Sequence, residues 1–156
     1  MMPATTNDAT ASDRVIRFLG NNQVNVLVSS EETRGKFCVL EAIIQPRGGA
    51  TALHTDRWLE TFHVLEGEVE WTVERDGQLV TWTATRGETI TVQPGVKHRW
   101  AGAGDTPSRM LTVGLPEFED FFRALAAAWE GPYDREKTPM AVGPVFARFG
   151  MELCAA

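Results

Sequence analysis

Hydrophobic and polar residues alternate along most of the first 115 positions, in short runs separated by glycine, proline and aspartate. The clearest runs form a pair on either side of Asp76-Gly77. Val69, Trp71 and Val73 fall on one face of the first run, and glutamates and a threonine fall on the other. A period of two is typical of a half-buried strand, and Asp-Gly favours a two-residue hairpin turn. The pattern therefore predicts an all-β domain of short strands.

The period changes after residue 115. Between Pro116 and Gly131, large apolar side chains recur every three or four residues, as they do on one face of a helix. These positions are Phe118, Phe121, Phe122, Leu125, Ala126 and Trp129. We expect this helix to pack its aromatic stripe on the outside of the β-domain. In the tail that follows, the sequence predicts a polar linker and one short helix around 142–149.

A chain of 156 residues is long enough for one domain with a single core. We expect a disordered leader over residues 1–13, a β-barrel over 14–115, and a helix and tail over 116–156 packed on the barrel. The net charge is −6, from 15 basic and 21 acidic residues, and no basic run predicts a nucleic-acid partner. No apolar run has membrane or signal-peptide length, and the two cysteines form no zinc or redox motif. These features predict a cytoplasmic protein without a membrane partner.

The stretch ALHTDRWLE, residues 52–60, places His54, Asp56 and Glu60 within seven positions at even spacing. If the chain is extended here, all three side chains point to one side. They could gather around a metal ion, around a bound substrate, or around nothing.

The same alternation assigns each residue that follows Glu60 to one of the two faces of the strand. Phe62 and Val64 share its face and are candidate pocket residues. His63 points to the opposite face, so we interpret it as a partly exposed strand histidine outside the site.

Glycines and histidines around this stretch are spaced as in the cupin superfamily, which the chain resembles. The first cupin motif reads Gly, five residues, His-x-His, three or four residues, Glu, six residues, Gly. GGATALHTDRWLETFHVLEG matches it, with Asp56 in place of the second histidine. The second motif matches at Gly87, Gly95 and His98 and departs from the family at Gln93 and Gly102. The likeness is greatest to small single-domain cupins related to quercetin dioxygenase-like proteins.

The resemblance implies a jelly-roll barrel of two antiparallel sheets whose inward residues bind one divalent metal ion. Carried over by position, the ligands are His54, Asp56, Glu60 and His98. Imidazole nitrogens with carboxylate oxygens suit Fe, Mn, Ni, Co or Zn. Because an aspartate is shorter than a histidine, Asp56 can bind the ion directly, bind it through water, or stand back from it.

The function that this resemblance implies is metal-dependent chemistry on a small-molecule substrate, with an oxygenase as the leading hypothesis. Glu60 or Asp56 would act as the base, and Phe62 and Val64 would form the pocket walls. Isomerase or lyase chemistry at the same ion is also compatible with the sequence. The alternative is a non-catalytic small-molecule-binding cupin with a degenerate or absent metal site. Because cupins commonly pair through their sheets, we expect a homodimer.

Overall fold

The computed structural model describes residues 11–47, 52–132, 134 and 136–155, and within them the chain forms two antiparallel sheets. One sheet has the order β1 (Val15–Phe18), β2 (Asn22–Val28), β3 (Cys38–Ile44), β10 (Ser108–Gly114), β5 (Glu60–Glu66) and β8 (Thr89–Val92). The other has the order β11 (Glu152–Leu153), β4 (His54–Thr55), β9 (His98–Gly102), β6 (Glu68–Arg75) and β7 (Gln78–Thr85). The predicted all-β fold of two antiparallel sheets is confirmed.

The β6–β7 hairpin shows how the alternating pattern becomes structure. Asp76 and Gly77 both have positive φ angles, 51° and 77°, as a two-residue primed turn requires. This turn pairs Trp71 with Trp82 across the two strands. Trp71 is fully buried on the inner face, as the period of two predicts.

The core lies between the inner faces of the two sheets. Its largest fully buried side chains are Trp71, Phe18, Leu40, Ile44 and Met110. Each large apolar side chain that is removed from water contributes about 1.5–3 kcal/mol to stability. Burial of this kind fixes which face of each strand points inward, and that choice positions the polar residues described below.

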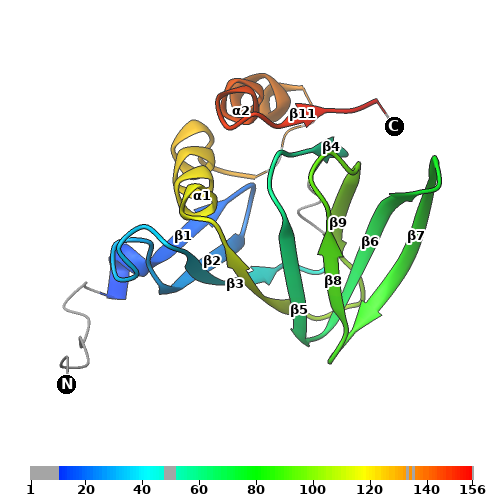
Figure 1. Ribbon diagram of the computed structural model, residues 1–156, viewed down its shortest axis with the longest axis horizontal. Coiled ribbons are helices and arrows are strands. Elements are labelled where there is room, and N and C mark those ends of the chain that lie inside the picture. Colours follow the sequence, from blue (N-terminus) through cyan, green and yellow to red (C-terminus); the bar gives the residue numbers. More distant parts are fainter. Residues whose placement is uncertain (1–10, 48–51, 133, 135, 156) are drawn as a thin grey trace.

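Two helices follow β10 and lie at one end of the barrel (Figure 1). The first, α1 (Pro116–Ala128), buries Phe118, Phe121, Phe122 and Leu125, as the helical spacing predicts. The second, α2 (Lys137–Arg148), begins five residues before the helix expected around 142–149. It contains two prolines and a glycine, which are poor helix formers. Its buried residues are Thr138, Val142 and Phe146. Their packing stabilises this helix, although the amino-acid composition of the segment does not favour one.

Most of the expected disordered leader, residues 1–13, lies outside the described residues. Its last three positions belong to a short 3-10 helix, η1 (Ala11–Arg14). No helix in the described part of the chain combines the length and apolar character needed to cross a membrane.

Gly102 yields a prediction about the barrel itself. A Cβ atom at this position would collide with the backbone carbonyl oxygen of Gln45. Gly102→Ala should therefore lower the free energy of unfolding by about 1–3 kcal/mol, because backbone atoms cannot move aside as side chains do. Urea denaturation measures the change.

Gly143→Ala is the matched control, since Gly143 lies in α2 with open space around the added methyl group. This variant should gain about 0.5–1 kcal/mol from helix propensity. Equal shifts of the urea midpoint in the two variants would contradict the packing described for Gly102.

Candidate metal centre

Four polar side chains meet inside the barrel below the helices. His54 on β4 and His98 on β9 are direct cross-strand partners, and their ring centroids lie 4.4 Å apart. Asp56 follows β4, and Glu60 begins β5 in the opposite sheet. All four side chains are buried, with residue exposures of 4% or less. The four residues expected to bind metal are thus brought together, although they are separated by up to 44 positions in the chain.

The even spacing of His54, Asp56 and Glu60 has a different structural basis from the one expected. The chain is not a continuous strand here, because it bends between β4 and β5 at Arg57 and Trp58. The carbonyl oxygen of Asp56 accepts a hydrogen bond of 2.8 Å from the backbone N–H of Gly95. This bond ties the bend to the turn of the second motif and holds Asp56 beside His98.

Backbone carbonyls orient both histidine rings. Nδ1 of His54 lies 2.7 Å from the carbonyl oxygen of Ala52, and Nδ1 of His98 lies 2.9 Å from that of Val96. A carbonyl oxygen only accepts hydrogen bonds, so each Nδ1 carries a proton. In the neutral rings, Nε2 therefore presents a lone pair. Metal-binding histidines are commonly held in this way.

The remaining donor atoms lie at spacings that one ion can bridge. Nε2 of His98 is 3.0 Å from Oε2 of Glu60 and 3.6 Å from Oδ2 of Asp56. Nε2 of His54 is 4.0 Å from Oδ2 of Asp56. Ligands about 2.1 Å from one octahedral ion are separated by about 3.0 Å when adjacent and about 4.2 Å when opposite. His54, Asp56 and His98 therefore fit a divalent metal ion, because each offers a ligand atom within 4.8 Å of the other two, and Glu60 lies beside His98.

The electrostatics of the cluster also favour a cation. Both oxygens of Asp56 are buried without a hydrogen-bond partner, and Oε2 of Glu60 also has none while Nε2 of His98 carries no proton. Burial and the neighbouring Glu60 raise the pKa of Asp56 to about 7. Burial and the neighbouring His98 lower the pKa of His54 to about 4. Burial alone would lower the pKa of His98, but Glu60 and Asp56 outweigh it and raise that pKa. Without a metal ion, a proton on His98 is the cation that the carboxylates attract.

Trp58 also contributes to the site, through a contact with Glu60 that the sequence does not predict. Its indole N–H donates a buried hydrogen bond of 3.1 Å to Oε1 of Glu60. This bond fixes the carboxylate so that Oε2 faces His98. The sequence hint for this role was spacing. Trp58 stands two positions before Glu60, in line with His54 and Asp56 at every second position.

The cluster opens into a cavity of about 20 Å³, roughly the space of one water molecule. Phe62 lines this cavity, as do His54, Glu60 and His98. Val64 is fully buried on the same face of β5, but it packs in the core and does not line the cavity. His63 lies on the other face, with Nδ1 2.8 Å from the hydroxyl of Thr89.

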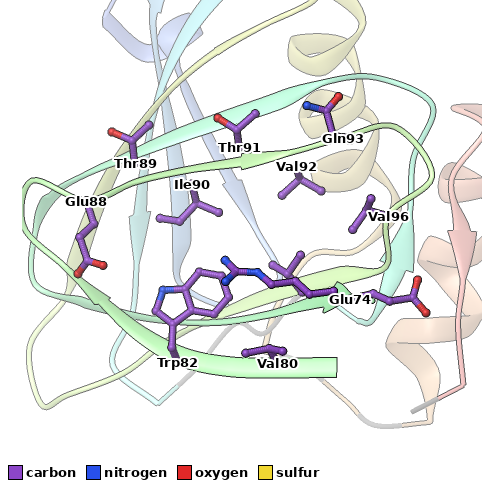
Figure 2. Close-up of a pocket in the computed structure, with 12 residues that line it drawn as sticks. Glu74, Val80, Trp82, Glu88, Thr89, Ile90, Thr91, Val92, Gln93 and Val96 are labelled. Atoms are coloured by element: carbon purple, nitrogen blue, oxygen red, sulfur yellow. The ribbon is translucent and has the colours of Figure 1, made fainter. Parts of the chain in front are cut away.

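A larger cleft of about 480 Å³ lies elsewhere, between the edge strands β7 and β8. Figure 2 shows Ile90, Val92 and Val96 pointing toward Val80 and Trp82 across it. None of the four clustered residues lines this cleft. Its volume suits a ligand, but the converging metal-ligating groups of the described residues lie at the smaller cavity.

Comparisons with known proteins agree with the barrel. Residues 40–114 match the cupin domain family. The polyketide cyclase RemF from Streptomyces resistomycificus superposes with a TM-score of 0.60 at 18% identity, over 93% of this chain and 99% of that one. A predicted oxalate decarboxylase from Thermotoga maritima gives a TM-score of 0.55 at 19% identity, over 67% of this chain and 95% of that one.

The Fe(II) form of HppE gives a TM-score of 0.54 at 16% identity, over 71% of this chain. This chain spans 63% of the length of HppE. No curated protein matches the sequence. Likenesses at such low identity show a shared fold. They do not single out quercetin dioxygenase-like proteins, and that finer resemblance stays a prediction.

The unpaired carboxylate of Asp56 gives a prediction for the metal-free protein. The folded-state pKa of about 7 lies above the ordinary value of 3.8, so the stability linked to this group is present below pH 4 and lost as the pH rises through 7. Asp56→Asn removes the buried charge. It should raise the free energy of unfolding by about 1–3 kcal/mol at pH 8, with a gain that shrinks toward pH 4.

Thermal unfolding of chelator-treated protein at both pH values measures this effect. Asp120→Asn, the same change on the exposed surface of α1, should give no such pH-dependent gain. A gain for Asp56→Asn that does not vary with pH would contradict the assignment of an unpaired buried carboxylate.

Proposed function

Residues 40–114 match the cupin domain family, and on that premise we propose that this chain is a metal-dependent enzyme that oxygenates a small organic molecule. One observation carries the proposal. Asp56 and Glu60 present unpaired buried oxygens beside the Nε2 atoms of two histidines whose Nδ1 atoms are already committed to backbone carbonyls. Such an arrangement is costly without a cation and favourable with one.

We assign His54, His98 and Glu60 as the ligands that fix the ion. Two histidines and one carboxylate form the ligand set of many non-haem iron oxygenases. Fold neighbours include a protein solved with Fe(II), which is compatible with this assignment. A bound divalent ion would supply Lewis acidity and, if it is iron, the capacity to activate dioxygen.

The other side chains have separate tasks. Trp58 holds Oε1 of Glu60, so that only Oε2 faces His98. Asp56 lies farther from both histidines than Glu60 lies from His98, and its two oxygens are uncommitted. We assign it as a fourth ligand and as the base that accepts a proton from substrate at Oδ1 or Oδ2. Phe62 belongs to the apolar wall that excludes water from these groups.

A second candidate function is binding without turnover. The small cavity favours it, because the described side chains leave room for about one water molecule beside the cluster. Isomerase or lyase chemistry would use the same ligands. The homodimer and the cytoplasmic location stay predictions.

Metal binding should respond in a graded way to substitution. His54→Ala and His98→Ala should each weaken binding by at least about 100-fold, since each removes a ligand. Trp58→Phe keeps an aromatic ring and loses only the bond to Glu60, so it should weaken binding by about 10-fold. Calorimetric titration of metal-free protein with Mn, Co, Ni and Zn ions, and with Fe(II) under nitrogen, measures the series.

His63→Ala is the control, because His63 lies on the same strand as Glu60 with its side chain on the opposite face. It should bind metal like the wild type. If the His63 variant lost as much affinity as the His54 and His98 variants, the metal site would not be where we place it.

The oxygenase assignment predicts oxygen consumption. Iron-loaded protein, given a panel of phenolic, enol and keto-acid compounds, should consume oxygen with at least one of them, as measured with an oxygen electrode. Asp56→Asn should lower the rate by about 100-fold or more if Asp56 is the base. A protein that binds one equivalent of metal and consumes no oxygen with any compound would favour the binding function instead.

A further inference from the structure

The walls of the metal-centre cavity are unusually uniform in chemistry. Apart from His54, Glu60 and His98, every side chain that lines it is apolar. Six of them are phenylalanines, namely Phe18, Phe62, Phe118, Phe121, Phe122 and Phe146. Helices α1 and α2 supply four of these rings and pack them over the cluster.

No lysine or arginine among the described residues lines this cavity. The two arginines that flank the motifs face elsewhere. Arg57 lies beside Gly150, and Arg99 donates a hydrogen bond of 3.3 Å to the hydroxyl of Thr72. A substrate carboxylate or phosphonate would therefore meet no cationic side chain in the cavity.

Charge counting leads to the same conclusion. With a divalent ion bound, two neutral histidines and two ionised carboxylates leave the site with no net charge. An anionic substrate that entered this neutral, apolar space would lose its hydration without gaining a balancing charge. An uncharged substrate would lose far less.

The ring of Phe146 lies directly beside His54. It lies edge-on to His54, with centroids 5.6 Å apart at 87°, and edge-on to Phe121 at 5.4 Å. It also lines a second cavity of about 30 Å³, together with Leu19, Thr138 and Val142, and Leu19 lines both cavities as well. Phe146 is therefore part of the lining that the two cavities share.

We propose that the substrate is an uncharged aromatic molecule whose ring takes the place of the Phe146 side chain beside His54. The substrate class rests on the proposed function, while the position of the ring-binding site rests on the cavity walls alone. Apolar cavities of about 150 Å³ stay dry and bind benzene-sized molecules, so a phenyl-sized opening here would be a competent ring site. Phe146 is then the residue that sets the size of ligand the site accepts.

The test compares two probes of similar shape, 2-naphthol and the anion 2-naphthoate, at pH 7. Their binding to metal-free and zinc-loaded protein is measured by calorimetry, so no turnover is needed. 2-Naphthol should bind about tenfold or more tightly than 2-naphthoate to both forms. Phe146→Ala should strengthen 2-naphthol binding by about tenfold, because the ring no longer has to be displaced.

Phe149→Ala is the matched control. Phe149 is also buried and packs against Phe121, but it lines neither cavity. It should leave 2-naphthol binding unchanged, while both variants lose stability through the lost ring. If Phe146→Ala does not fold, Phe146→Leu gives a smaller gain in the same direction.

Equal or tighter binding of 2-naphthoate would overturn the substrate class. Equal effects of the Phe146 and Phe149 variants would overturn the assigned ring position. Failure of the proposed function has a different signature, since a protein that refuses metal ions in the titration could still bind 2-naphthol in its metal-free form. Metal binding without any 2-naphthol binding would overturn this inference alone.

Discussion

Two carboxylates held in an apolar barrel impose the constraint on which the site depends. Asp56 and Glu60 are almost fully buried, and three of their four oxygens have no hydrogen-bond partner. Leaving buried carboxylates unpaired costs several kcal/mol each, so the fold must supply a proton or a cation. Burial and Glu60 raise the pKa of Asp56, and Glu60 and Asp56 outweigh burial to raise the pKa of His98, so these groups favour protons in the absence of a metal ion.

The rest of the structure is arranged around this constraint. One register of β4 against β9 sets His54 opposite His98, and two backbone carbonyls turn both rings so that Nε2 faces inward. The C-terminal strand β11 pairs with β4, so the end of the chain helps to hold His54 in place. Helices α1 and α2 then close the space with aromatic rings, and a dry space strengthens every electrostatic interaction within it.

The sequence was informative where a local rule and the tertiary structure agree. Alternation and the Asp76-Gly77 turn predicted the β6–β7 hairpin, and parity placed His63 on the outer face. Helical spacing predicted the buried rings of α1. The spacing of the two motifs indicated the family and brought His98 into the candidate site, which no local pattern could do.

The features that the sequence did not predict depend on contacts between residues that lie far apart in the chain. The bend at Arg57 and Trp58 interrupts the strand that parity assumed, and the site forms because that bend is tied to Gly95. The first turn of α2 begins where the carboxylate of Asp134 accepts hydrogen bonds from the backbone N–H groups of Glu136 and Lys137, and Pro139 is tolerated there because first-turn N–H groups have no helical partner. Strands β4 and β11 are two residues long, too short for any periodicity. Val64 points to the same face of β5 as Glu60. Alternation predicts this face, but it does not predict how far along the strand the cavity extends.

The most direct test of the account is a crystal structure of the metal-loaded protein with diffraction data collected at the absorption edge of the bound metal. We expect one strong anomalous peak within bonding distance of Nε2 of His54, Nε2 of His98 and a carboxylate oxygen of Glu60, with Asp56 adjacent. A peak at any other position, or ordered side chains around the cluster with no peak after loading, would contradict the assignment of this cluster as a metal centre.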